Sequence, residues 1–182
     1  MEPIAASRII GASPEDDRRG IQALLAGASL EISSRDPAEI DASAGLLEPG
    51  TAVYISMPPG QTCHGTVALA ARIKRAGFRP VPHVAARRIA SREALAEYLA
   101  RAAGEAGVDG AFVIAGDGDR ASGPFDSSLA LLGTGLFQRH GIVHIGVAGY
   151  PEGHPGIAAS RSRRRWPRKK ASPGGRVSIC RW

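Results

Sequence analysis

The chain contains few cysteines and no long apolar run. Its 182 residues include two cysteines, Cys63 and Cys180. Two cysteines are too few for a disulfide framework, so we expect a reducing compartment, the cytoplasm. No run approaches 18 consecutive apolar residues, so no membrane span is predicted. The segment Met1–Arg8 has no basic stretch followed by an apolar one, and no secretory signal is therefore expected.

Sequence signals for nucleotide and metal sites are weak or missing. No Gly-x-Gly-x-x-Gly follows an expected strand, which argues against a Rossmann site. Cys63 and His64 are adjacent but have no second ligand pair at zinc spacing. The Gly-Asp-Gly-Asp string at 116–119 lacks the further oxygen ligands and distal Glu of a calcium loop. We therefore predict no metal site.

Acidic residues are missing from the last 25 positions. Residues 158–182 hold nine of the 23 Lys and Arg residues of the chain. Residues 1–157 therefore carry 14 basic and all 17 acidic side chains, which gives this part a net charge of −3. We therefore predict that residues 158–182 form a basic, irregular and disordered tail. Such a tail is typical of a nucleic-acid arm or of a shifted reading frame in a GC-rich gene. The abrupt change of composition favours the frame shift, so we do not expect a nucleic-acid partner.

Short apolar runs alternate with helical patterns along residues 1–157. The expected strands are Ala28–Ile32, Thr51–Met57, Arg79–Ala85, Gly110–Gly116 and Ile142–Gly149. The expected helices cover Ser13 to Gly27, His64 to Ala76, Arg92–Ala106 and Asp126 to Arg139, with a short helical or irregular connection at Pro37–Gly50. Strands that alternate with helices predict an α/β fold with a parallel sheet.

Polar residues with useful chemistry lie in these runs or just after them. Parallel sheets bind ligands at the carboxyl ends of their strands, so one site built from several strand ends is the simplest expectation. The candidates are Glu31, Arg35, Ser56, Gln61, His83, Arg87, Asp117, Asp119, Tyr150, Glu152 and His154.

Each candidate also has a plainer interpretation. Glu31 could be a surface residue at a strand end, or a carboxyl group desolvated enough to hold and donate a proton. A strand histidine such as His83 is more often a core residue than a ligand. Asp117 follows a buried strand and Gly116, which would let a ligand approach the backbone, whereas Asp119 fits an ordinary turn.

Four motifs resemble the methylenetetrahydrofolate reductase family. Residues 148–155, Ala-Gly-Tyr-Pro-Glu-Gly-His-Pro, resemble its Tyr-Pro-Glu-x-His-Pro signature. Pro82-His83-Val84, Ala115-Gly116-Asp117 and Leu30-Glu31-Ile32 resemble further motifs of that family in the same order. The resemblance covers about residues 12–157.

The resemblance implies a (β/α)₈ barrel of the TIM type, of which this chain holds about the first five βα units. It implies a flavoenzyme that passes hydride from NAD(P)H through FAD to 5,10-methylenetetrahydrofolate, giving 5-methyltetrahydrofolate. Glu31 would be the general acid and Asp117 would lie near the flavin and the folate. The implied FAD contacts are Ser56, His83, Gly116, Asp117, Tyr150 and His154.

Two departures from the family pattern modify these expectations. Ala115 stands where the family usually has an Arg. The family's next helix and its Thr-Gln strand are missing after residue 157. We therefore expect a partial barrel domain over 1–157, cut off or frame-shifted there, that binds FAD weakly and self-associates as a homo-oligomer. The alternatives are a non-enzymatic α/β module with a basic nucleic-acid-binding tail and a barrel enzyme for another one-carbon or phosphate-bearing substrate.

Overall fold

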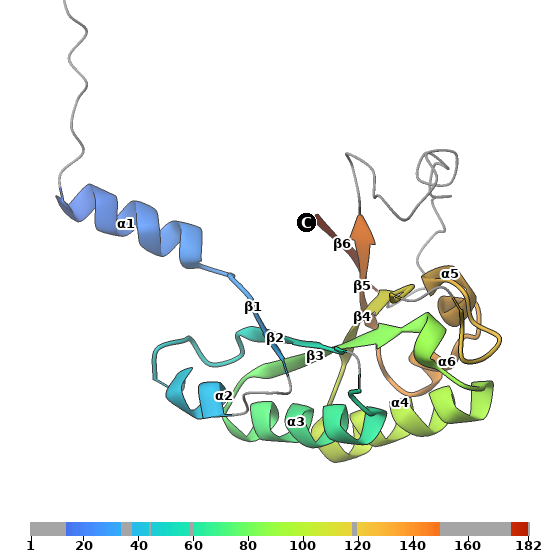
Figure 1. The fold of residues 1–182 in the computed structure, drawn as a ribbon. Coiled ribbons are helices and arrows are strands. Elements are labelled where there is room, and N and C mark those ends of the chain that lie inside the picture. Colours follow the sequence, from blue (N-terminus) through green and yellow to red (C-terminus); the bar gives the residue numbers. More distant parts are fainter. Residues whose placement is uncertain are drawn as a thin grey trace, which may run out of the picture.

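The computed structural model of the chain describes residues 14–33, 38–43, 45–58, 60–117, 120–149 and 176–181. Six strands form one parallel sheet in the order β1-β2-β3-β4-β5-β6 (Figure 1). The strands are β1 Leu30–Ser33, β2 Ala52–Ser56, β3 Arg79–Ala85, β4 Gly110–Ile114, β5 His144–Gly149 and β6 Arg176–Arg181. Sequence order and spatial order are therefore the same across the sheet.

Helices connect most of these strands. They are α1 Pro14–Leu25, α2 Ala38–Ser43, α3 Cys63–Arg75, α4 Arg92–Ala106, α5 Ser128–Leu132 and α6 Leu136–Arg139, with a 3₁₀ turn at Ala86–Arg88. α3 and α4 lie side by side beneath the sheet in Figure 1. The expected α/β fold with strands and helices in alternation is confirmed. Closure into a barrel stays a prediction.

The longest helix, α4, follows directly from its sequence. Ser91 precedes it, and the Ser91 side-chain oxygen accepts a hydrogen bond from the backbone N–H of Ala94 at 3.1 Å. This bond satisfies one of the backbone donors that a helix start leaves unpaired. Gly107 ends the helix in the left-handed conformation, with φ 59°. Leu95 and Leu99 lie four residues apart on its apolar stripe and are fully buried.

The core lies between the sheet and the pair α3 and α4. Strand side chains alternate between two faces, so every second residue points toward these helices. The buried strand residues on this side are Ile32, Val53, Ile55, Val84, Ala111, Val113, Ile145 and Val147. They pack with Val67, Leu69, Ala70, Ile73, Leu95, Leu99 and Ala102 of α3 and α4. This packing fixes which side chains point to the opposite face.

The prediction of one continuous helix from Asp126 to Arg139 is wrong. The structure has two short helices there, α5 and α6, separated at residues 133–135. Gly135 adopts a positive φ of 70°, which leaves the helical region. The Thr134 hydroxyl donates to the Leu131 carbonyl at 2.6 Å and satisfies a group at the end of α5.

The prediction of an irregular tail over 158–182 is wrong for its last residues. Residues Arg176–Arg181 form β6, which pairs in parallel with β5 from His144↔Arg176 to Gly149↔Arg181. Val177 and Ile179 are β-branched and favour extended backbone. The edge of β5 offers unpaired backbone groups that such a segment can satisfy. Residues 150–175 and Trp182 lie outside the described residues.

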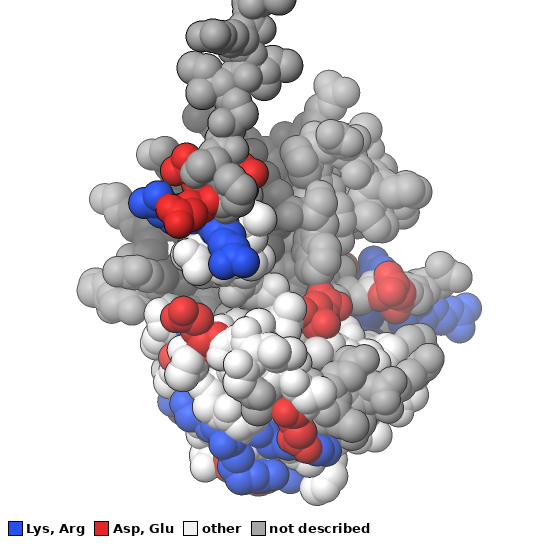
Figure 2. Space-filling model, turned by 90° about the vertical axis from the view of Figure 1, so that its left-hand side faces the viewer, with Lys and Arg blue, Asp and Glu red and all other residues white. Residues whose placement is uncertain are grey.

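α1 stands apart from the sheet (Figure 1). Its described side chains, Glu15 to Ala23 and Leu25, are all exposed. Figure 2 views the molecule from this side. The acidic side chains of α1 lie in its upper part, and Lys and Arg gather at the lower end, where Figure 1 places α3. Within the described residues, no helix combines the length and apolar content needed to cross a bilayer.

Gly146 of β5 provides a test of this packing. A Cβ atom there would lie 2.8 Å from Phe112 Cδ2 on the neighbouring strand. Gly146→Ala should therefore lower the free energy of unfolding by about 1–3 kcal/mol, as overpacking does. Gly104→Ala in α4 is the matched control, because a Cβ there meets nothing within 4 Å. It should raise stability by about 0.5–1 kcal/mol. Urea denaturation measures both, and equal effects would contradict the packing described here.

Candidate functional site

The face of the sheet opposite α3 and α4 carries a row of polar and aromatic side chains. Glu31 of β1 is paired in register with Tyr54 of β2. His83 of β3 is paired with Phe112 of β4, which in turn is paired with Gly146 of β5. Because paired residues on parallel strands point to the same side, these residues share one face. We call this set the Glu31–His83 face.

Two of the predicted site residues meet on this face. His83 Nε2 lies 3.7 Å from Glu31 Oε2. The His83 side chain is 8 % exposed, whereas that of Glu31 is 35 % exposed. The distance is too long for a hydrogen bond, and His83 Nε2 is buried without a hydrogen-bond partner among the described residues. The pair thus joins a solvent-accessible carboxyl group to a buried imidazole.

Burial moves the pKa values of this pair in opposite directions. Desolvation raises the pKa of Glu31 above its usual value. Desolvation lowers the pKa of His83 to about 4. Both shifts favour the neutral form, since burial penalises charge. At neutral pH His83 is therefore an uncharged imidazole, and its approach to Glu31 is a dipole contact and not an ion pair.

Aromatic rings hold the His83 imidazole in place. The Phe112 ring centroid is 4.9 Å from that of His83, and the Tyr54 ring meets both other rings edge-on, at 6.2 Å from His83 and 5.8 Å from Phe112. These separations are typical of favourable aromatic pairs. The missing side chain of Gly146 leaves room for Phe112 beside it. Sequence reasoning missed Tyr54, Phe112 and Gly146, because only the strand register shows that they adjoin His83.

Ser56 lies on the same face, two residues after Tyr54. Its hydroxyl donates to the backbone carbonyl of Ile32 at 3.0 Å and so ties β2 to β1. The Ser56 oxygen can still accept a hydrogen bond from a ligand. The structure thus brings Ser56 to the candidate site but gives it a structural task as well.

Gly116 and Asp117 follow β4 at its carboxyl end. Gly116 has a φ of 85°, and a Cβ atom there would lie 2.9 Å from the Cβ of Ala85, so this turn requires glycine. Arg87 braces the turn: its backbone N–H donates to Ala115 O at 2.9 Å and its Nη1 donates to Gly116 O at 3.2 Å. Asp117 is exposed beyond this turn. A guanidinium and a carboxylate therefore lie at one strand end.

The remaining strand-end candidates differ in outcome. Gln61 precedes α3, and its Nε2 lies 3.5 Å from Thr66 Oγ1. The others lie outside the described residues: Arg35, Asp119, Tyr150, Glu152 and His154. The fifth-strand motif at 148–155, on which the resemblance depends most, is thus described only as far as Gly149.

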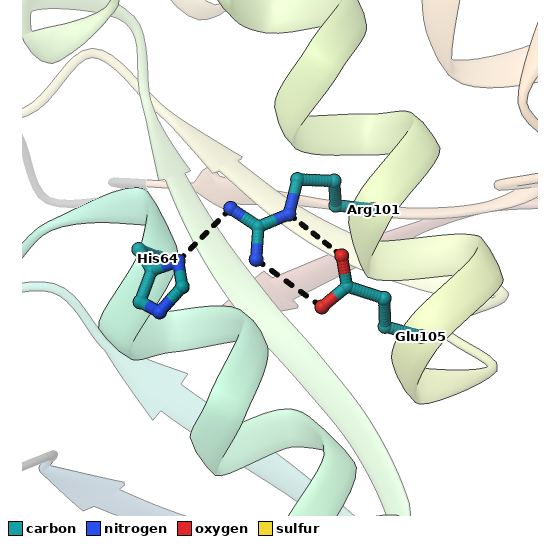
Figure 3. Close-up of polar contacts among 3 residues, drawn as sticks. All are labelled: His64, Arg101 and Glu105. Carbon is teal, nitrogen blue, oxygen red and sulfur yellow. Dashed lines mark hydrogen bonds and ion pairs between the residues drawn. The ribbon is translucent and has the colours of Figure 1, made fainter.

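His64 has a structural partner on α4. Arg101 of α4 binds Glu105 through two N–H groups, at 2.7 and 3.2 Å, and its Nη1 lies 3.0 Å from His64 Nδ1 (Figure 3). A guanidinium only donates, so His64 Nδ1 is the acceptor, and the contact links α3 to α4.

Burial raises the pKa of the Cys63 thiol. No three His, Cys, Asp or Glu side chains of the described part of the chain form a group that could hold a metal ion.

No protein-family model matches the chain. The candidate site is therefore defined by its own geometry: an accessible carboxyl group, a neutral buried imidazole and an aromatic row on one face of a parallel sheet, with Arg87 and Asp117 after neighbouring strands.

His83 should make stability depend on pH. Its pKa of about 4 in the folded protein lies below the usual 6.5. The unfolded chain therefore binds this proton more readily, and stability should be full above pH 6.5 and fall as pH drops toward 4. The loss in the free energy of unfolding should approach about 3 kcal/mol, because a difference of one between the folded and unfolded pKa corresponds to about 1.36 kcal/mol.

The measurement is urea denaturation between pH 4 and 7 for the wild-type chain and His83→Phe, which keeps a ring but removes the titration. Gln138→Ala, an exposed change on α6 that alters no titratable group, is the control and should keep the wild-type slope. A wild-type stability that does not change across this range would refute the assigned environment of His83.

Proposed function

We propose that this chain is a flavin-binding protein of the methylenetetrahydrofolate reductase type, with Glu31 as the acid of its site. One observation carries the proposal: Glu31 and His83, which lie 52 residues apart in the sequence and come from two different motifs, meet on one face of a parallel sheet. The order of the motifs and their strand positions support the same assignment. When bound, FAD supplies hydride transfer from NAD(P)H to 5,10-methylenetetrahydrofolate.

The residues present fit a flavin at three points. His83 Nε2 is a buried polar atom without a partner among the described residues, and such an atom points to a group that completes its hydrogen bonding. Ser56 Oγ retains acceptor capacity. Arg87 places a cation beside Gly116. The preceding residue, Ala115, stands where the family usually has an Arg, so Arg87 would supply the missing positive charge. We therefore assign Ser56, His83 and Gly116 to flavin contacts, with Arg87 as a further contact to the diphosphate.

Glu31 has the environment that a general acid needs. Burial raises its pKa, so the carboxyl group holds a proton at higher pH than an ordinary Glu does. Its side chain remains accessible, so the proton can pass from a carboxyl oxygen to a ring nitrogen of the folate. Neutral His83 leaves this proton in place, since a cation at 3.7 Å would favour the carboxylate. Asp117 would orient the folate or flavin from the end of β4.

The proposal is tested with the full chain, FAD, NAD(P)H and 5,10-methylenetetrahydrofolate. Flavin fluorescence measures FAD binding, and oxidation of NAD(P)H measures turnover. Glu31→Gln should bind FAD as the wild-type chain does and lose about 10²- to 10⁴-fold in turnover, which is typical of a lost general acid. Turnover of the wild-type chain should fall as pH rises through the pKa of Glu31, because the protonated form is needed.

Glu48→Gln, an exposed carboxyl-to-amide change away from the site, should leave both measurements unchanged. Failure of the wild-type chain to bind FAD would overturn the flavin assignment. FAD binding together with unchanged turnover in Glu31→Gln would overturn only the role of Glu31.

A further inference from the structure

α1 exposes two large apolar side chains among those that the structure describes. Ile21 and Leu25 are 56 % and 64 % exposed, and they lie four residues apart on one side of the helix. Isolated helices of about 12 residues are marginal in water, because few hydrogen bonds offset the cost of starting them. A helix of this length therefore needs a packing partner for its apolar side.

The same helix has an acidic start. Glu15, Asp16 and Asp17 occupy its first turn, where carboxylates also suit the helix dipole. Arg18 and Arg19 follow this turn, Arg19 lies 3.5 Å from Asp16, and three acidic and two basic residues leave α1 with a net charge of −1. A partner surface for α1 should therefore combine cations with exposed apolar groups.

The C-terminal turn of α3 has the first of these properties, a group of cations. It carries Arg72, Lys74 and Arg75, and a surface hollow of about 520 Å³ is lined there by Asp41, Arg72, Arg75 and Ala76. Asp41 pairs with Arg72, which leaves Lys74 and Arg75 as the exposed cations of this turn.

The loop after α2 adds an apolar group to this region. Leu46 lies in that loop and is 83 % exposed. The backbone N–H of Gly50 donates to the carbonyl of Gly77 at 2.8 Å and so holds the loop against the end of α3. We call Leu46, Arg75 and Ala76 the α3-end surface.

Both complementary surfaces lie on one side of the molecule. On this side, Figure 2 shows the three acidic residues of α1 above, together with its two arginines, and a group of basic side chains at the lower end. A twofold axis between them would place α1 of each copy on the α3-end surface of the other, so that the contact forms twice.

We propose that a second copy of this chain binds here, with Ile21 and Leu25 against the α3-end surface and Asp17 near Arg75. A nucleic acid would match the cations alone, since the carboxylates of α1 would repel it.

Sedimentation equilibrium on the full chain tests the dimer. The wild-type chain should be a dimer, and Ile21→Ser with Leu25→Ser should raise its dissociation constant at least about tenfold. Asp17→Lys and Arg75→Glu should each weaken it, and the two changes together should restore much of the loss because the charges are exchanged. Added salt should weaken the wild-type dimer.

Leu129→Ser on α5 and Arg139→Glu on α6 are matched controls, since both residues are exposed outside the proposed contact. They should leave the dissociation constant unchanged. Circular dichroism confirms that each variant is folded. A monomeric wild-type chain, a dimer insensitive to the Ile21 and Leu25 changes, or an exchanged pair weaker than either single variant would overturn the proposal. FAD takes no part in these measurements, so they do not depend on the proposed function.

Discussion

The register of the parallel strands is the constraint on which the core and the candidate site both depend. Because side chains alternate along a strand, slipping β3 by one residue against its neighbours would move His83 to the side of α3 and α4 and Val84 to the opposite face. Val84 and Val113 are paired in register and fully buried, so this slip would expose apolar surface and bury an imidazole in the core. Packing against α3 and α4 therefore determines where His83 points.

Burial explains the chemistry of the site as well as its geometry. The same loss of water raises the pKa of Glu31 and lowers that of His83, so both groups favour their neutral forms. If His83 were exposed, it would be charged more readily near Glu31 and would favour the carboxylate. The rings of Phe112 and Tyr54 lie around His83 and help to keep it dry. The rings packed around His83 thus help to set the protonation of the Glu31–His83 pair.

The sequence predicts the elements of the fold better than their contacts. The apolar runs at β2, β3 and β4 and the cap at Ser91 are local signals, and the structure has these elements within one or two residues of the expected bounds. The break at Gly135 could have been read from the Gly-Thr-Gly step, but the apolar pattern continues across it. The expectation that Glu31 and His83 belong to one site follows from their positions on successive strands and from the family resemblance. The aromatic row and the brace from Arg87 depend on register and turn geometry, which no short motif contains.

β6 separates the structural role of a sixth strand from its chemical role. A parallel strand beside β5 needs only extended backbone in register, and Arg176–Arg181 supplies it over six paired positions. The resemblance implies a Thr-Gln strand after the fifth βα unit, with contacts to folate and nicotinamide. The β6 sequence, Arg-Val-Ser-Ile-Cys-Arg, contains neither residue. Backbone pairing can therefore protect the edge of β5 while the side chains for substrate recognition are different. Weak FAD binding with little turnover would then reflect lost recognition chemistry, and a loss of sheet structure would not be needed to explain it.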